Sequence, residues 1–382
     1  MIIVMKADVA ADAPDLRQVI ALAQSYPGIS TQVHRIQGAT RSVTEVYLLG
    51  PTGVVPSAPF EEFESVEKVV RVTQSFRAIG RHDGGLEAVG FEYNGVKLSQ
   101  DTFHVFPGLC AVDTREHVEQ TFRALQDLGI VTTRAGAYKP RSSPYDFQGL
   151  GADCLPWVFE MAGKHGIRII AMEVTHEPHI SEILSALEAS GRPTGVMLQI
   201  GTRNAQNFEL LKAVGQQTEL PVLFKRGMGI TLEESLNACE YVASGGNRRI
   251  VFCLRGMKTN LGDPHRNFVD FAHVPVVKRL TRLPVGIDPS HSVGRRTVGP
   301  DGLLDIFHVT AQGVIAGANM VLVDVHPRPE KALCDGPQAM LLDELPGFVE
   351  DVAIARRAYE ERRRRAESDA PTLRSHFGRT PA

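Results

Sequence analysis

Residues 168–200 read RIIAMEVTHEPHISEILSALEASGRPTGVMLQI, and the fold can be predicted from this stretch outward. Its two ends, 168–174 and 195–200, are short and almost wholly apolar, as strands are when both faces of their sheet are buried. The segment between them is long enough for one helix. Parallel strands need such a crossover connection, so the stretch predicts a strand–helix–strand unit of a parallel sheet.

The same unit recurs from residue 103 to residue 345. Segments with helical periodicity, for example 116–128 and 232–243, separate further short apolar runs. The other strand candidates are 103–110, 131–137, 221–225, 248–254, 284–288 and 319–325. Eight such units predict a (β/α)8 TIM barrel, an α/β fold, and a doubly wound open sheet is the alternative.

Residues 1–80 follow a different pattern, in which strands and helices are mixed. We predict a strand at 2–5, a helix that starts near Pro14, and strands at 31–37 and 43–49. The last two predicted elements are a helix with Phe60, Phe63, Val66 and Val69 on one side and a strand over Arg71–Ile79. This order predicts a small α+β domain without an obvious catalytic cluster, which we expect to serve regulation or assembly.

Two further segments complete the predicted layout. Residues 81–102 are rich in glycine and polar side chains, and Tyr93-Asn94-Gly95-Val96 is typical of a type I′ hairpin. We interpret this segment as a junction that covers the bottom of the barrel. Residues 346–382 form a predicted C-terminal helix, which ends at the charged run 360–365, and a tail. The arginines of that run suit a solvated helix end.

The composition limits the classes of partner. The chain has 41 Lys+Arg against 44 Asp+Glu, a formal net charge of -3, which argues against binding to nucleic acid or to a membrane surface. No stretch approaches the roughly 20 apolar residues of a membrane span, and the N-terminus does not resemble a secretory signal. The five cysteines have no paired spacing, so we expect free thiols in the reducing cytoplasm.

Polar residues stand at the ends of nearly all predicted barrel strands, where the catalytic groups of this fold lie. In chain order they are Cys110, Arg134, Glu173, Arg203, Lys225, Arg255, His291 and Asp324. Six basic residues would converge on this mouth of the barrel: Arg134, Lys139, Arg141, Arg203, Lys225 and Arg255. Such a cluster is unfavourable unless anions fill it, so we expect substrates with more than one phosphate or carboxylate group.

A second set combines one thiol, one imidazole and two carboxylates: Cys110, His291, Asp324 and Asp335. Mixed sulfur, nitrogen and oxygen donors suit Mn, Fe, Co or Zn better than Mg or Ca. The alternative is a structural role, since a cysteine at a strand end is often a small buried hydrophobe.

Several longer motifs carry a family resemblance. They are 134–151 (RAGAYKPRSSPYDFQGLG), 199–204 (QIGTRN), 223–227 (LFKRG), 288–296 (DPSHSVGRR) and 325–337 (VHPRPEKALCDGP). In this order they resemble 3-deoxy-D-arabino-heptulosonate 7-phosphate (DAHP) synthases over nearly the whole chain. Residues 1–80 are similar to the ferredoxin-like regulatory domain of one branch of that family.

The resemblance implies an activity: metal-dependent, aldol-like condensation of phosphoenolpyruvate with erythrose 4-phosphate to DAHP and phosphate, the first step of the shikimate pathway. It implies that Cys110, His291, Asp324 and Asp335 bind the metal. The phosphoenolpyruvate phosphate would contact Arg203, Lys225 and Arg255, and its carboxylate Arg134 and Lys139. Arg141 and Ser142 would meet the aldose, and Glu173 and Lys225 would handle the protons of the attacking water. The resemblance also implies a homo-oligomer, a tetramer or a dimer, with an aromatic amino acid as effector.

The sequence departs from the family pattern at the site. Leu109 replaces a proline before Cys110, Leu254 replaces a glutamate before Arg255, and Thr202 replaces an alanine before Arg203. Asp324 replaces a metal-binding glutamate and is one methylene shorter. These departures keep two alternatives open: a paralogue with the same chemistry on a different aldose in secondary metabolism, and a catalytically silent regulatory barrel.

Overall fold

The computed structural model describes residues 1–382 except 8, 38–41, 73–74, 83–89 and 377–382. In these residues eight parallel strands close into a barrel, because β14 pairs with both β13 and β7. The strands are β7 (His104–Leu109), β8 (Thr132–Ala135), β9 (Ile169–Val174), β10 (Gly195–Ile200), β11 (Val222–Lys225), β12 (Ile250–Leu254), β13 (Val285–Ile287) and β14 (Met320–His326). The predicted TIM barrel is confirmed, and the closing pairs exclude the open sheet.

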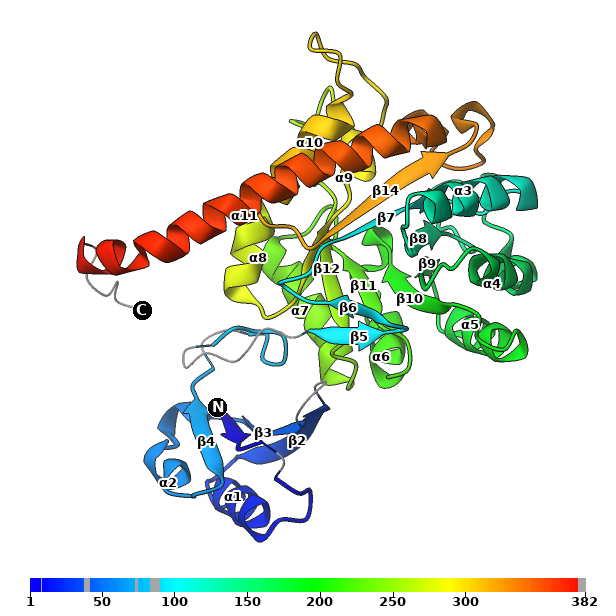
Figure 1. The fold of residues 1–382 in the computed structure, drawn as a ribbon. Helices are drawn as coiled ribbons and strands as arrows, with labels where there is room; N and C mark the ends of the chain where they lie inside the picture. Colours follow the sequence, from blue (N-terminus) through cyan, green and yellow to red (C-terminus); the bar gives the residue numbers. More distant parts are fainter. Residues whose placement is uncertain (8, 38–41, 73–74, 83–89, 377–382) are drawn as a thin grey trace.

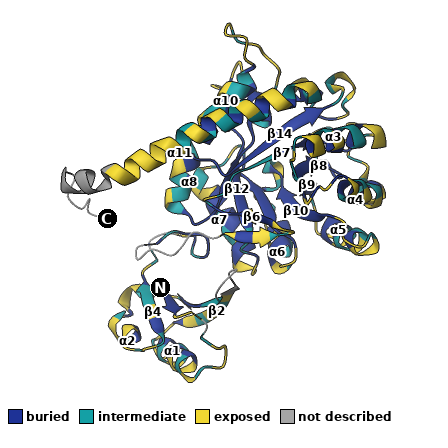
Figure 2. Cartoon of the chain, viewed as in Figure 1, coloured by how far each residue is buried: buried dark blue, intermediate teal, exposed yellow. Residues whose placement is uncertain are grey.

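Helices surround the barrel (Figure 1). They are α3 (Arg115–Asp127), α4 (Leu155–Lys164), α5 (Pro178–Ala189), α6 (Phe208–Gln216), α7 (Leu232–Ser244), α8 (Val274–Leu280), α9 (Pro289–Val293), α10 (Asp305–Ile315) and α11 (Leu345–His376). Figure 2 shows the barrel strands buried and the outer faces of the helices exposed. The strands are short apolar runs because one face packs on the helices and the other fills the barrel.

Alternate residues of the strands fill the barrel interior. Ile169 and Ala171 of β9 and Met320 and Leu322 of β14 belong to one buried cluster inside the barrel. Ile170 belongs instead to the larger cluster that the strands form with the helices. This alternation follows from the period of two along a strand, and it determines which strand-end residues point into the mouth of the barrel.

A hairpin closes the N-terminal end of the barrel. It consists of β5 (Phe91–Tyr93) and β6 (Val96–Leu98), joined by Asn94 and Gly95 with φ of 46° and 73°. Both values are positive, as the predicted type I′ turn requires. Phe91, Val96 and Leu98 belong to the interior cluster of the barrel, and Tyr93 Oη accepts a hydrogen bond of 3.2 Å from the backbone of β10. Since the hairpin covers the N-terminal end of the barrel, a functional site must lie at the other end, where the strands have their C-termini.

The N-terminal residues form a separate antiparallel sheet with the order β2-β3-β1-β4, below the barrel in Figure 1. Its elements are β1 (Ile2–Met5), α1 (Pro14–Gln24), β2 (Ser30–Gln37), β3 (Ser42–Leu49), α2 (Ala58–Glu61) and β4 (Val66–Val70). This order and connectivity are those of a ferredoxin-like fold.

The prediction for 60–79 was wrong in detail. The helix α2 ends at Glu61, and Val66 and Val69, placed on that helix, lie in β4. The spacing of three allowed a helix, but these β-branched residues pair with β1, for example Val69 with Ile3. The described residues of Arg71–Ile79 form no strand, since Glu240 accepts hydrogen bonds from the backbone N–H groups of 77–79.

The C-terminal helix is longer than predicted. α11 continues past 365 to His376, where the tail was predicted, and extends beyond the barrel, while residues 377–382 lie outside the described part of the chain. Ion pairs at helical spacing, such as Arg363 with Glu367 at 2.9 Å, support this extension. No helix in the described ranges is both long enough and apolar enough to cross a bilayer.

A buried carboxylate connects the N-terminal sheet to the barrel. Glu45 of β3 is 2% exposed. Its Oε2 lies 3.0 Å from Arg248 Nη1, and its Oε1 lies 3.4 Å from Arg282 Nη1. These two arginines precede β12 and β13, at the N-terminal end of the barrel. Tyr47 donates a hydrogen bond of 2.8 Å to the same carboxylate. Burial alone would raise the pKa of Glu45, but Arg282 and Arg248 outweigh it and lower that pKa, so the group is ionised.

We expect Glu45→Gln to destabilise the protein by about 3–5 kcal/mol, because it removes the carboxylate that pairs with buried Arg282 and half-buried Arg248. The measurement is the free energy of unfolding in urea, followed by circular dichroism. Glu67→Gln on the exposed side of β4 is the control and should change this free energy little. An unchanged free energy in Glu45→Gln would show that water, not the carboxylate, compensates these charges.

Candidate functional site

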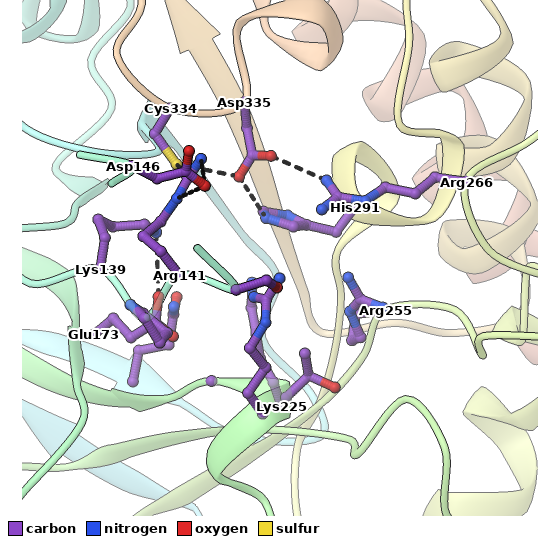
Figure 3. Close-up of a pocket in the computed structure, with 16 residues that line it drawn as sticks. Lys139, Arg141, Asp146, Glu173, Lys225, Arg255, Arg266, His291, Cys334 and Asp335 are labelled. Atoms are coloured by element: carbon purple, nitrogen blue, oxygen red, sulfur yellow. Dashed lines mark hydrogen bonds and ion pairs between the residues drawn. The ribbon is translucent and has the colours of Figure 1, made fainter. Parts of the chain in front are cut away.

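The C-terminal ends of the barrel strands surround one polar cavity of about 230 Å³ (Figure 3). It is lined by Lys139, Pro140, Arg141, Ser142, Asp146, Glu173, Gln199, Gly201, Thr202, Arg203, Lys225, Arg255, Arg266, His291, Cys334 and Asp335. Three further predicted residues, Cys110, Arg134 and Asp324, are buried beside the cavity and contact one another and its lining. The structure thus brings all the predicted site residues to one place.

The strand alternation explains why these side chains point inward. Five site residues stand two positions beyond an apolar residue of the barrel interior: Glu173 after Ala171, Gln199 after Met197, Lys225 after Leu223, Arg255 after Cys253 and Asp324 after Leu322. The site is therefore the uppermost layer of the barrel interior, with polar in place of apolar side chains. Gly201 gives this layer space, since a Cβ there would lie 1.9 Å from Glu173 Oε1.

The same alternation locates the departures from the family pattern. Leu109 and Leu254 are buried in the cluster that the strands form with the helices, on the face turned away from the barrel interior. Thr202 lines the cavity, and its hydroxyl donates a hydrogen bond of 2.8 Å to the carbonyl of Arg226. Asp324 is the one departure among the metal-donor candidates.

Buried acids pair with the lysines of the site. Lys139 Nζ lies 3.1 Å from Glu173 Oε2, and Lys225 forms an ion pair with Asp288. Burial would lower the pKa of Lys139, but nearby Cys110 and Glu173 outweigh it and raise that pKa.

Arg255 differs from the paired lysines. It is 3% exposed, burial lowers its pKa against the opposing effect of Asp288, and its Nε has no hydrogen-bond partner among the described residues. A guanidinium buried in this way favours an anionic ligand with oxygens that can accept its free N–H groups. Arg203, which also lines the cavity, is more exposed.

Arg134 lies deeper than the other basic residues. It is 2% exposed, its Nη1 forms an ion pair with Asp324 Oδ1, and its Nη2 lies 3.5 Å from Cys110 Sγ. Burial opposes its charge, but Asp324 and Cys110 outweigh burial and raise the pKa of Arg134. Arg134 therefore holds two of the predicted metal donors as well as adding positive charge to the site.

The predicted metal donors fall into two overlapping groups that share the Cys110 thiol, and the second group also contains Cys334. Donor atoms of Cys110, His291 and Asp324 all lie within 4.8 Å of one another, and so do those of Cys110, Cys334 and Asp335. The groups are joined by His291 Nε2, which lies 3.5 Å from Asp335 Oδ2. Sulfur, nitrogen and oxygen donors at this spacing can hold a divalent transition metal.

The imidazole of His291 is fixed by a carboxylate behind it. Its Nδ1 lies 2.9 Å from Asp288 Oδ2, and the Asp288 side chain also accepts the backbone N–H of His291. Burial would lower the pKa of His291, but Asp288 outweighs burial and raises it to about 10. A carboxylate on one ring nitrogen orients the other nitrogen toward its ligand, as in many metal sites.

The sequence prediction missed several residues of the site. They are Asp288, which pairs with Lys225 and His291; Cys334 and Asp146, which contact Arg141; and Gln199, Arg266 and Gln338. Asp288 and Cys334 lie inside quoted motifs, Cys334 directly before Asp335 and Asp288 three residues before His291, so their positions were the available signal. Nothing in the sequence pattern singles out Arg266, which reaches the site from a loop, or Gln338, which reaches it from a short 3-10 helix.

Comparisons with known proteins agree with this geometry. A model of the DAHP synthetase I family matches residues 87–357. A phospho-2-dehydro-3-deoxyheptonate aldolase of Thermotoga maritima is 35% identical over 92% of this chain and 96% of its own length. A 2-dehydro-3-deoxyphosphooctonate aldolase of Desulfosudis oleivorans is 26% identical over 67% of this chain and 91% of its own. The crystal structure of a Thermotoga maritima DAHP synthase superposes with a TM-score of 0.66 at 34% identity, covering 92% of this chain and 95% of that one.

Gln338 offers a test of how the donors are positioned. Its Nε2 donates a hydrogen bond of 2.6 Å to Asp324 Oδ2, and its Oε1 accepts one of 2.9 Å from Arg266 Nη1. The same Nη1 of Arg266 forms an ion pair with Asp335 Oδ1 at 3.0 Å. We expect Gln338→Leu to weaken Mn²⁺ binding by about 10–100-fold, because both carboxylates lose their orientation. Isothermal titration of the metal-free protein measures this affinity. The control Gln24→Leu, on α1, should bind as the wild type, and an unchanged affinity in Gln338→Leu would exclude the positioning role.

Proposed function

Since this chain belongs to the DAHP synthetase I family, we propose that it is a transferase that condenses phosphoenolpyruvate with erythrose 4-phosphate to DAHP and phosphate. The carrying observation is that one cavity combines Lys139, Arg203, Lys225 and Arg255 with the Cys110–His291–Asp324 donors. Two anionic substrates explain the basic residues, and one metal ion explains the thiol, imidazole and carboxylate donors.

The basic residues divide between the two substrates. In the proposal Arg203, Lys225 and Arg255 bind the phosphate of phosphoenolpyruvate, because they end neighbouring strands on one side of the cavity. Lys139 and Arg134 bind its carboxylate. Arg141 and Ser142 face the cavity from the loop after β8 and would contact the phosphorylated aldose. Multiple fixed cations orient the substrates and reduce the entropy lost on reaching the reactive geometry.

The donor set fits a divalent transition metal, and we propose Cys110, His291, Asp324 and Asp335 as its ligands. The fit rests on the short distances between the donors and on the Asp288 carboxylate behind His291. When bound, the metal supplies Lewis acidity for the aldehyde oxygen of the aldose. The mixture of thiolate, imidazole and carboxylate favours Mn, Fe, Co or Zn.

Glu173 and Lys225 are the proposed proton-transfer residues. C3 of phosphoenolpyruvate attacks the aldehyde carbon, water adds at C2, and phosphate leaves by cleavage of the C–O bond. Burial would raise the pKa of Glu173, but Lys139 and Lys225 outweigh burial and lower it, so its carboxylate is ionised and can accept a proton from the water. Lys225, paired with Asp288, can stabilise the leaving phosphate.

Two observations favour a different aldose as the second candidate. Relatives named 2-dehydro-3-deoxyphosphooctonate aldolase align with 67% of this chain, and Asp324 departs from the metal-binding glutamate of the family. A catalytically silent barrel is the third candidate, and the retained cations and donors argue against it.

Regulation and assembly belong to the same proposal. Residues 1–80 are the proposed site of an aromatic amino acid effector, and their sheet contacts the barrel through Glu45, Arg248 and Arg282. We propose that the chain forms a homo-oligomer. All five cysteines are free thiols, which supports a reducing compartment such as the cytoplasm.

The test of the proposed function is phosphate release from phosphoenolpyruvate by the Mn²⁺-loaded protein with erythrose 4-phosphate and a panel of other phosphorylated aldoses. We expect turnover with erythrose 4-phosphate. Turnover with another aldose alone would select the second candidate. Absence of phosphate release with every aldose would select the silent barrel.

Metal removal gives a second prediction. Treatment with EDTA should reduce phosphate release to the background rate, and Mn²⁺ should restore it, because the donors cannot polarise the aldehyde alone. Cys110→Ala should lose the same activity without recovery. Cys154→Ser is the control, because this thiol donates to the carbonyl of Gly151 outside the cavity. Full activity after chelation would contradict the metal's role.

A further inference from the structure

A second thiol, Cys334, lies beside the predicted thiol ligand. It is 6% exposed and lines the cavity directly before Asp335. Its Sγ is 3.8 Å from Cys110 Sγ and 3.4 Å from Asp335 Oδ2, and Cys110 Sγ is 3.2 Å from the same oxygen. Three donor atoms from two distant segments thus form a compact triangle, shown in part in Figure 3.

The separation of the two sulfurs matches a shared metal ion. Thiolates bind zinc at about 2.3 Å in tetrahedral geometry, which places two of them about 3.8 Å apart. Cys110 and Cys334 have this separation already. Asp335 Oδ2 lies 3.2 Å from Cys110 Sγ and 3.4 Å from Cys334 Sγ, close to the edge lengths of the same tetrahedron. A small movement of the three side chains would therefore let all three donor atoms bind one ion.

Cations lie beside both sulfurs. Arg141 Nη1 lies 2.8 Å from Cys334 Sγ, and Lys139 Nζ lies 3.3 Å from Cys110 Sγ. The positive side chains offset the charge of two thiolates and one carboxylate on a single ion.

We propose that Cys334 is a further metal ligand, and that Cys110, Cys334 and Asp335 make the site prefer a thiophilic divalent ion such as Zn²⁺ over Mn²⁺. The inference rests on the proposed metal-dependent function and refines its metal. Cys334 adds to the four ligands already proposed, and among these Asp324 is also held by its ion pair with Arg134 and its hydrogen bond with Gln338. Soft sulfur ligands select thiophilic ions.

The test uses Co²⁺ as a spectroscopic probe of the metal-free full-length protein, kept reduced with a phosphine. Sulfur-to-cobalt charge transfer absorbs in the near ultraviolet, and its intensity rises with the number of bound thiolates. We expect Cys334→Ser to lose about half of this intensity, because one of two soft ligands is removed. Competition titrations should show Zn²⁺ binding weakened by about tenfold or more, with Mn²⁺ binding changed less. Cys154→Ser is the matched control and should keep the full intensity.

The outcomes separate the inference from the function on which it rests. Unchanged charge-transfer intensity in Cys334→Ser would overturn the role of Cys334, while a remaining band would still support Cys110. Absence of any sulfur–cobalt band in the wild type would contradict the metal site itself. X-ray absorption of the Zn²⁺-loaded wild type counts its sulfur ligands without any variant: two support the inference and one overturns it.

Discussion

The pairing of β14 with β7 is the interaction on which the active site depends. Met320 pairs with His104 and Asp324 with Gly108, so the last strand of the barrel lies beside the first. This closure places Asp324 next to Cys110, and α9 follows β13 to bring His291 to the same edge. Without it, donors from opposite ends of the chain would have no common location, and the strand-end residues would form an open row.

Paired charges make so polar a layer compatible with a buried position. Arg134 with Asp324, Lys225 with Asp288 and Lys139 with Glu173 are almost fully buried. A buried charge without a partner destabilises a protein by several kcal/mol, so these pairs allow the barrel to fold before any ligand binds. The pair of Lys139 with Glu173 keeps this lysine protonated and this glutamate ionised, which are the states that anion binding and proton transfer require.

The two parts of the chain differed in how well the sequence predicted them. All eight barrel strands lie within a few residues of their predicted positions, because buried parallel strands are continuous apolar runs with clear helical segments between them. In residues 60–79 the apolar spacing suited a helix, and pairing of Val66–Val70 with β1 decided for a strand. In this segment the pairing of β4 with β1, a tertiary contact with the first residues of the chain, outweighs the local helical pattern.

Strand periodicity is a local property, and it was enough to predict the barrel, the inward direction of Glu173, Lys225 and Arg255, and the kinds of ligand that they suit. The pairing of each acid with its base, and the presence of Cys334, Arg266 and Gln338 in the site, can be seen in the tertiary structure alone. Cys334 and Arg266 lie in loops and Gln338 in a short 3-10 helix, whose course is set by packing and hydrogen bonds with distant segments, and no periodic pattern encodes such contacts.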